Sequence, residues 1–545
     1  MADASHVALP RSDRPAKADA TRVRDADPAA AVEVTLSLRG RDLPEAGQGP
    51  PEPISREELA SQYGASQSDV DAVRDALGHY GLTVPADSVS LAARTVVARG
   101  TVAQMQEAFG TRLAIYQNKD QGEFRGRDGD LSIPRELDGI VIGVFGLDER
   151  RVARRYGSNG ASGASTASPM GPAEFEQHYS FPAGNGTGQT IGIAEFGGGY
   201  FDTDLRAFNK KYGRAMPNVV TVPCGAPAYT LAQIQALPHN QQQEALNDSG
   251  EVMLDVEVAG SLCPGAELVV YFAPFTQKGW VDLLTAVIDG TPASPLCLSV
   301  SWGLAEDAPD WSSGALQVID QQLGAVAKLG ITVLAASGDD GSGNQVNDGK
   351  FHVNFPASSP NVLAVGGTQL DDSSPPKEVV WWQPEGDRAS GGGSTGGGVS
   401  TVFSRPAWQT VTVATLNSGA GAFDGRVVPD VSALAGPPFY DMIFQGKDHA
   451  VGGTSAATPL WAALLARLAA SKPGAVSRFM APLFYTPSGN GSPIGQVACR
   501  DVVSGDNASP NPGTGYKAGP GFDAVSGWGT PQGSLLVQML GASTQ

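Results

Sequence analysis

The apolar positions of this chain follow two patterns, one near its start and another over most of its length. Residues 32–38 alternate between apolar and polar, which is typical of a strand with one buried face. Further strands are predicted at 95–101 and 112–116, and helices at 55–60, 66–80 and 102–109. Ser55 opens the first helix with a Ser-x-x-Glu capping box. This β-α-α-β-α-β order predicts an α+β unit of ferredoxin-like type.

From about residue 172 to residue 541 the chain predicts one large α/β domain. Its strands are near-continuous apolar runs, which indicates a sheet that is covered on both faces. The predicted strands are 190–196, 267–272, 296–302, 332–336 and 362–365. The predicted helices are 250–262, 281–289, 313–329 and one that begins just after Ser455. The alternation of strands with helices predicts a parallel sheet.

Two polar segments flank the smaller unit. Residues 1–31 are polar, so we expect them to be disordered, and they lack the apolar core of an ordinary signal peptide. Residues 157–168 are almost entirely Gly, Ser, Ala, Thr and Asn, a composition that cannot bury a core. Such an exposed segment is either a plain tether or a site of proteolytic processing. We therefore divide the chain into residues 1–31, 32–155, a linker at 156–170, and 171–545.

The composition of the 545-residue chain excludes several classes of function. Its formal net charge of −19 argues against a nucleic-acid partner, which would need a basic face. No apolar run approaches the roughly 18 residues that a membrane span needs, so no membrane association is expected. The four cysteines include no Cys-x-x-Cys pair, which leaves a zinc or thioredoxin-type site without support. We expect free, buried thiols.

Two acidic residues fall on a helix that is predicted to be buried. Glu251 and Asp255 are four residues apart, so both side chains point to the same face. Helical acids usually form a solvated stripe, but the rest of this helix is mostly Val, Met, Leu and Ala. Two carboxyl groups buried together would share a proton, and one pKa would rise. This arrangement suits general acid–base catalysis at low pH.

A serine stands where a run of small residues meets the start of a predicted helix. Ser455 follows Gly453 and Thr454, and Pro459 is expected in the first helical turn. A serine at such a place is usually only an N-cap. The helix N-terminus nevertheless directs free N–H groups at whatever bonds to the serine oxygen. None of the six histidines lies in a turn that would present a catalytic base, so the acid pair is the better candidate.

On these motifs the chain resembles the sedolisin family of serine-carboxyl peptidases, closest to the kumamolisin type, over essentially its whole length. The resemblance implies a subtilisin-like, parallel-sheet catalytic domain that follows an α+β prodomain. It also implies that carboxylic acids replace the histidine base. Ser455 would be the nucleophile, Glu251 the general base and acid, and Asp255 its proton-sharing partner.

Further roles follow from the same resemblance. Residues 337–341 resemble the family's Gly-Asp-Ser-Gly turn, which implies that Asp339 is the oxyanion-hole acid. Asp340 stands where that turn has serine. The family's outer hydrogen-bonded pair falls on Glu195 and Trp302. An acid in an oxyanion hole must be protonated to donate a hydrogen bond, so these roles imply an optimum at roughly pH 3–5.

A third feature lies near the C-terminus, in residues 500–507 and 518–523. Taken alone, these residues fit either an Asx-rich turn or a set of the oxygen ligands that calcium prefers. The resemblance implies one structural Ca²⁺ here. Its ligands would be the side chains of Asp501 and Asp523 and the carbonyl groups of Val502, Gly519 and Gly521.

The resemblance finally implies how the whole protein works. It would be a secreted, monomeric endopeptidase that acts on proteins and peptides. Its prodomain would inhibit it until acidification causes cleavage within about residues 154–170. Asn354 stands where close relatives would have Asp, which leaves the substrate preference open. An inactive binding protein and a His-dependent hydrolase are the alternatives. All four catalytic residues are present, which argues against the first, and the placement of the histidines argues against the second.

Overall fold

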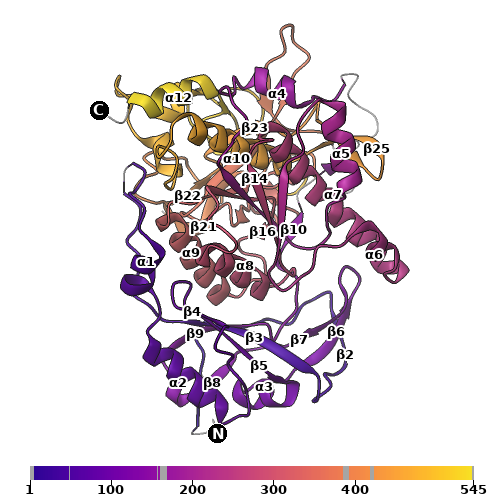
Figure 1. Ribbon diagram of the computed structural model, residues 1–545, viewed down its shortest axis with the longest axis vertical. Helices are drawn as coiled ribbons and strands as arrows, with labels where there is room; N and C mark the ends of the chain where they lie inside the picture. Colours follow the sequence, from indigo (N-terminus) through magenta and orange to yellow (C-terminus); the bar gives the residue numbers. More distant parts are fainter. Residues whose placement is uncertain are drawn as a thin grey trace.

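The computed structural model describes residues 5–47, 49–155, 158–159, 168–384, 392–417 and 423–542. Most of the linker predicted at 156–170 lies outside these residues. Figure 1 shows a smaller body, indigo to purple, below a larger one that carries the C-terminus. The two bodies contact each other along one broad face.

The larger body is built on a sheet of eight described strands. Their order is β13-β14-β12-β15-β17-β19-β20, and β23 pairs with β19. All neighbours are parallel except β19 and β20. The strands are β12 (Thr190–Glu195), β13 (Asn218–Pro223), β14 (Glu267–Phe272), β15 (Cys297–Val300), β17 (Thr332–Ala336), β19 (Leu363–Leu370), β20 (Glu378–Val380) and β23 (Val431–Leu434). The predicted parallel sheet is confirmed.

Helices cover both faces of this sheet. On one face, α7 (His239–Leu262) and α10 (Thr454–Ser471) share a core with Leu268 and Val270 of β14. On the other face, α8 (Gln277–Asp289) and α9 (Ser313–Lys328) share a core with Val269 and Tyr271. Successive side chains of a strand point to opposite faces, so a strand covered on both sides is expected to be apolar at nearly every position. The continuous apolar runs in the sequence have this cause.

Shorter elements complete the larger body. They are α4 (Pro172–His178), α5 (Asp202–Lys211), α6 (Leu231–Gln235), α11 (Ile494–Ala498), α12 (Gly533–Ala542), β16 (Trp302–Ala305), β18 (Asn354–Phe355), β21 (Gly398–Ser404), β22 (Gly425–Val428), β24 (Tyr440–Phe444), β25 (Lys447–Gly452), β26 (Cys499–Arg500) and β27 (Thr530–Pro531). Two short strands of the linker region, β10 (Arg154–Arg155) and β11 (Ser158–Asn159), pair with β16 and β25.

The smaller body is an α+β unit with an antiparallel sheet in the order β4-β5-β3-β9. Its elements are β3 (Ala31–Leu38), α1 (Arg56–Tyr63), α2 (Gln67–Gly78), β4 (Val89–Ser90), β5 (Thr95–Thr101), α3 (Val102–Ala108), β6 (Ala114–Asn118), β7 (Gly122–Gly126), β8 (Ser132–Pro134) and β9 (Val141–Phe145). Ser55 caps α1, because its hydroxyl accepts the N–H of Glu58 at 3.1 Å, but the Glu58 side chain accepts from Gln62 at 3.0 Å, so only half of the predicted capping box is formed.

The prediction that residues 1–31 are disordered is wrong for the described part of that segment. β1 (His6–Ala8) pairs with β8, and β2 (Thr21–Asp25) pairs with β6. Leu9 is buried in the core of the smaller body. Every side chain of β2 is exposed, so this strand forms through main-chain pairing and leaves no apolar pattern in the sequence.

The smaller body lies with its sheet against α8 and α9 (Figure 1). Several polar contacts cross this interface. For example, Thr35 donates to Asp282 at 2.7 Å, and Ser90 donates to Asp289 at 2.5 Å. Lys278 of α8 also donates to Glu33 of β3 at 2.9 Å. Neighbouring side chains of the two bodies thus meet as donor and acceptor.

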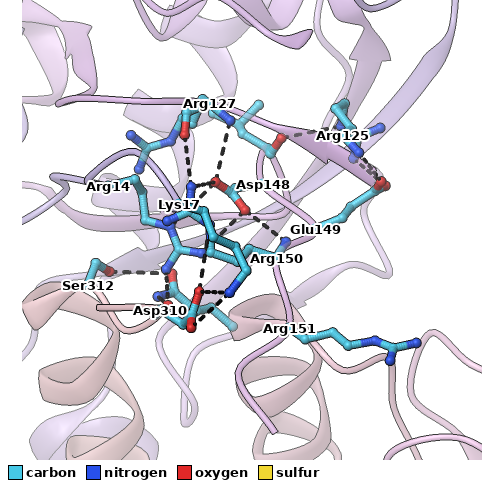
Figure 2. Close-up of polar contacts among 12 residues, drawn as sticks. Arg14, Lys17, Arg125, Arg127, Asp148, Glu149, Arg150, Arg151, Asp310 and Ser312 are labelled. Atoms are coloured by element: carbon cyan, nitrogen blue, oxygen red, sulfur yellow. Dashed lines mark hydrogen bonds and ion pairs between the residues drawn. The ribbon is translucent and has the colours of Figure 1, made fainter. Parts of the chain in front are cut away.

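A second set of interface contacts surrounds Asp310 of the larger body (Figure 2). Lys17 donates to both carboxylate oxygens of Asp310, at 3.0 and 3.2 Å. Arg150 Nε lies 3.9 Å from the same carboxylate, and Arg14 donates to the main-chain carbonyl of Asp310. The N-terminal segment therefore supplies two of the three cations that hold this part of the interface.

Two sequence expectations concern the whole chain. The four cysteines are free and buried, as predicted. Among the residues that the structure describes, no helix combines the length and the apolar character needed to span a membrane.

Candidate active site

Glu251 and Asp255 lie one turn apart on α7, and both side chains are buried. The helix begins at His239, whereas the sequence predicted a start at residue 250. The first turns are polar, so they gave no apolar signal from which the prediction could be made. Asp255 accepts a hydrogen bond from the Ser301 hydroxyl, which lies 3.0 and 2.8 Å from its two oxygens. Burial raises the pKa of the Asp255 carboxyl well above its usual range, and the charge of Glu251 raises it further.

Ser455 is the second residue of α10, after an N-cap at Gly453. Gly453 has φ of 108°, a left-handed conformation that other residues rarely adopt, so the approach to the serine requires glycine. The Ser455 hydroxyl is buried, and within the described part of the chain it has no hydrogen-bond partner. It therefore lies at a helix N-terminus as predicted, but it does not act as the cap.

Pro459 lies in the second turn of α10, not in the first turn as predicted. A proline lacks the N–H that would bond to the carbonyl four residues earlier, which here is the carbonyl of Ser455. The Ser301 hydroxyl lies 3.3 Å from that carbonyl oxygen. Ser301 thus contacts both Asp255 on α7 and the main chain of Ser455 on α10.

Asp339 follows β17 and faces the start of α10. Its Oδ1 accepts the N–H of Thr454 at 2.8 Å and the Thr454 hydroxyl at 2.7 Å. Its Oδ2 is buried and has no hydrogen-bond partner among the described residues. Burial raises the pKa of the Asp339 carboxyl well above its usual range, although the two bonds from Thr454 lower it. A carboxyl group whose neutral form is favoured by burial thus lies next to the start of α10, with Oδ2 available.

Glu195 lies at the end of β12 and Trp302 at the start of β16, and they contact each other as the predicted outer hydrogen-bonded pair. The Trp302 indole N–H donates to Glu195 Oε2 at 2.9 Å, and both side chains are buried. Burial raises the pKa of the Glu195 carboxyl well above its usual range, and the charges of Asp255 and Glu251 raise it further. Since Glu251 also acts on Asp255 and Asp339, these four acids form one electrostatic cluster.

Sequence reasoning missed two residues that join this site together. Ser301 directly precedes Trp302, and Thr454 directly precedes Ser455, so both stood inside motifs whose neighbours were identified. Serine and threonine are too common for their type to signal a contact. Their roles depend on three segments that meet only in the folded chain.

β10, at the end of the prodomain, and β11, in the linker, reach the same region. β10 runs antiparallel to β16, with Arg154 opposite Gly303 and Arg155 opposite Trp302. The Arg154 guanidinium donates to Asp340 Oδ2 at 2.7 Å, and the Arg155 guanidinium donates to Asp248 Oδ1 at 3.2 Å. β11 pairs with β25, and its Ser158 lies opposite Gly452, which directly precedes Gly453. β10 and β11 thus both pair with strands that lead to or from residues of the candidate site.

Three of the four histidines of the larger body make contacts elsewhere, and the fourth, His239, is exposed at the start of α7. His352 lies 2.8 Å from both Asp307 and Asp348. His178 lies 3.4 Å from Glu378, and His449 is 3.3 Å from the carbonyl of Phe444. These contacts agree with the choice of the acid pair over a histidine base.

The candidate calcium residues lie together in one C-terminal loop region. Asp501 accepts the N–H of Gly521 at 2.8 Å, and Asp523 accepts the N–H of Gly519 at 3.0 Å. The described chain holds no group of three or more His, Cys, Asp or Glu side chains that could bind a metal. A site here would therefore need main-chain oxygens. The carbonyl oxygens of Val502, Gly519 and Gly521 accept no hydrogen bond from described residues, which fits that need.

Two protein-family profiles and several known proteins match this sequence. The profile described as "Pro-kumamolisin, activation domain" matches residues 18–150, and that of the "Subtilase family" matches residues 240–488. Kumamolisin of a Bacillus species is 36% identical over 500 residues, which cover 89% of this chain and 86% of kumamolisin. Tripeptidyl-peptidase sed5 of Aspergillus fumigatus is 30% identical over 98% of this chain and 97% of its own length.

A solved structure gives the same result. Pseudomonas sedolisin, a serine-carboxyl proteinase in complex with two molecules of pseudo-iodotyrostatin, is 29% identical to this chain. The match covers 69% of this chain and 98% of sedolisin, with a TM-score of 0.55. A prodomain docked on a subtilisin-like domain, a buried cluster of acids beside a serine and these relatives lead to one conclusion. The chain belongs to the sedolisin family of serine-carboxyl peptidases, with the activation domain of the kumamolisin type.

Proposed function

We propose that this peptidase cleaves peptide bonds through an acyl-enzyme on Ser455, with Glu251 and Asp255 as the acid–base pair. The observation that carries the proposal is the buried acid cluster beside a buried serine hydroxyl at a helix N-terminus. A serine hydroxyl is a weak nucleophile until a neighbouring base removes its proton. Glu251 would take that proton and later deliver it to the leaving amine, while Asp255 would share it.

Asp339 would stabilise the oxyanion that forms on the attacked carbonyl. Only a protonated carboxyl group can donate a hydrogen bond to that oxygen, and the raised pKa of Asp339 favours this form. Thr454 occupies Oδ1, which leaves Oδ2 for the oxyanion. The hydrogen bond between Trp302 and Glu195 would fix the position of Glu195 within the acid cluster. A site that depends on protonated acids would work in acid, at roughly pH 3–5.

The test is hydrolysis of an unstructured peptide by the full chain after incubation at pH 4. Ser455→Ala and Glu251→Gln should each reduce kcat by more than about 1000-fold. Glu257→Gln is the matched control, because Glu257 is a buried acid of the same helix whose carboxylate bonds to the N–H of Ile443. Full activity of Glu251→Ala at neutral pH would overturn the assignment in favour of a histidine base.

We also propose that the protein is a zymogen that cleaves itself within about residues 154–170. β10 and β11 lie against strands that border the candidate site, which would bring this segment to Ser455. N-terminal sequencing after a shift to pH 4 should reveal a new terminus in this range. The Ser455→Ala chain should remain intact, and equal cleavage of both chains would count against self-processing.

Two further properties belong to the proposal. The whole acid cluster comes from one chain, so a monomer would suffice for activity, and secretion would fit a peptidase that works in acid. We propose that Asp501, Asp523 and the carbonyls of Val502, Gly519 and Gly521 hold one Ca²⁺. The ion would stabilise the C-terminal loops and would take no part in the chemistry.

A further inference from the structure

Strand β10 occupies the site region as an extended peptide would. β16 pairs with β10 along one edge and with β18 along the other, so β10 completes a three-stranded sheet. Addition of a strand to a sheet edge is a common mode of peptide recognition. Main-chain pairing supplies affinity in this mode, and pockets for alternate side chains supply specificity.

The two arginines of β10 contact acids on different elements. Arg155 reaches Asp248 on α7, and its side chain is 38% exposed. Arg154 reaches the loop after β17, where one nitrogen lies 2.7 Å from Asp340 Oδ2 and 2.8 Å from Asn344 Oδ1. The Arg154 side chain is 28% exposed, so it is the more buried of the two arginines.

Asp340 is held firmly in the orientation that meets Arg154. The N–H of Gly392 donates to Asp340 Oδ1 at 2.9 Å, on the opposite side of the carboxylate from Arg154. The Ser509 hydroxyl donates to the carbonyl of Asp340 at 2.6 Å. Side chain and main chain are therefore both fixed by parts of the catalytic domain, and the acceptor is preorganised for a cation.

Asn344 is fixed in the same way. It is left-handed, with φ of 47°, and its side-chain amide donates to Asn354 of β18. Its amide oxygen therefore faces Arg154 next to the Asp340 carboxylate. A carboxylate oxygen and an amide oxygen on one side form a site that suits a guanidinium, whose several N–H groups lie in one plane.

We propose that Asp340 and Asn344 form a substrate subsite that selects arginine. The selected residue is the one whose main chain pairs with Gly303 of β16. Arg154 fills this subsite in the zymogen, and a substrate arginine fills it once the prodomain has left. The inference rests on the proposed function, since it requires a substrate to take the place of β10. It names the substrate class as peptides with arginine at one position before the scissile bond.

The experiment uses full-length protein that has been processed at pH 4 and is assayed at pH 5. Each substrate is an alanine-rich peptide with one arginine, moved in turn through the positions before the scissile bond. The readout is kcat/KM for each arginine peptide divided by kcat/KM for the alanine peptide. One preparation supplies both values, so the amount of active enzyme cancels.

We expect an arginine preference of about tenfold at one position, typical of a charged hydrogen bond. Asp340→Asn and Asp340→Ser should both reduce the ratio at that position to about one. Lysine should be preferred less than arginine. The matched control is Asp372→Asn, an exposed aspartate on the loop after β19, which should leave the ratio unchanged.

Four outcomes would contradict the subsite or the proposed function. A preference that persists in Asp340→Asn, or no preference at any position, would overturn the subsite. An altered rate of self-cleavage with an unchanged ratio would also overturn it, because Asp340 would then serve only the prodomain. If no peptide is cleaved faster by the wild-type chain than by Ser455→Ala, the proposed function itself fails.

Discussion

Asp339 illustrates at the scale of one residue how burial prepares a carboxyl group for acid chemistry. Its neutral form is favoured because its surroundings desolvate it, and Thr454 fixes its orientation. Asp339→Ala should lower kcat about 100-fold with little change in KM, as loss of one oxyanion donor does. Asp339→Asn keeps an N–H donor and should lose less. Steady-state kinetics at pH 4 check both values, and full kcat in Asp339→Ala would contradict the role.

The pH dependence of stability tests the same residue independently of activity. A carboxyl group whose pKa is raised in the folded state stabilises the fold below its unfolded pKa, near 3.9. That contribution is lost as the pH rises through the folded pKa. The thermal midpoint of Asp339→Asn should therefore fall less than that of the wild type as the pH rises from 4 to 8. Parallel curves for the two proteins would show that Asp339 is not buried as described.

At the scale of elements, Ser301 links two helices through one hydroxyl group. It lies between β15 and β16 and contacts Asp255 of α7 and the carbonyl that Pro459 leaves open in α10. Ser301→Ala should lower the free energy of unfolding by about 1–3 kcal/mol, because a buried acceptor loses its donor. The substitution should also raise the pH at which kcat falls on the acid side of its pH profile. The reason is that Asp255 loses a hydrogen bond that favours its ionised form and lowers its pKa. Ser301→Thr keeps the hydroxyl and should restore the profile.

The C-terminal loops allow a second prediction at this scale. If Asp501 and Asp523 hold Ca²⁺ between them, a chelator should lower the thermal midpoint by several degrees, because an ion bound only to the folded state stabilises it. Added Ca²⁺ should reverse the loss. Asp501→Asn should lower the midpoint in buffer with Ca²⁺ and show little response to chelator. An unchanged midpoint in the wild type would exclude a stabilising ion.

The sequence predicted elements well where one physical signal dominates. Continuous apolar runs located β14 and β17, because strands buried on both faces have few polar positions. The exposed strand β2 and the polar first turns of α7 carried no such signal and were missed. The acid pair was found from its helical spacing together with the apolar residues that surround it on the same helix. Ser301 could not be found, because its two partners lie 46 and 154 residues away in the chain.

At the scale of the whole molecule, many of the contacts that hold the linker and the prodomain in place are ionic. Lys17, Arg14 and Arg150 surround Asp310 (Figure 2). Asp310→Asn removes the charge at the centre of this set without changing its shape. We expect faster self-cleavage of this variant at pH 6, where the wild type should still be held. Gel analysis over time measures the rate, and Asp372→Asn serves as the control away from the interface.

The ion pair between Arg155 and Asp248 couples the linker to pH in a more specific way. Burial raises the pKa of Asp248 to about 7, although Arg155 opposes the shift. Glu244 raises the pKa further, and Arg151 lowers it. Asp248 is therefore ionised and holds Arg155 above about pH 7, and it becomes neutral as the pH falls through that value. The protonated form also suits the fold, since a raised pKa stabilises the folded state below the unfolded pKa and loses that effect as the pH rises through about 7.

Acidification should therefore loosen the linker before the catalytic acids reach their working range. The Ser455→Ala chain allows this step to be followed without cleavage. Amide hydrogen exchange in the peptide that contains Arg155 should increase between pH 8 and pH 6, after correction for the intrinsic effect of pH on exchange. Asp248→Asn is neutral at every pH, so its linker should exchange fast throughout and lose this step. A linker that is equally protected at both pH values in the Ser455→Ala chain would mean that Asp248 does not control its release.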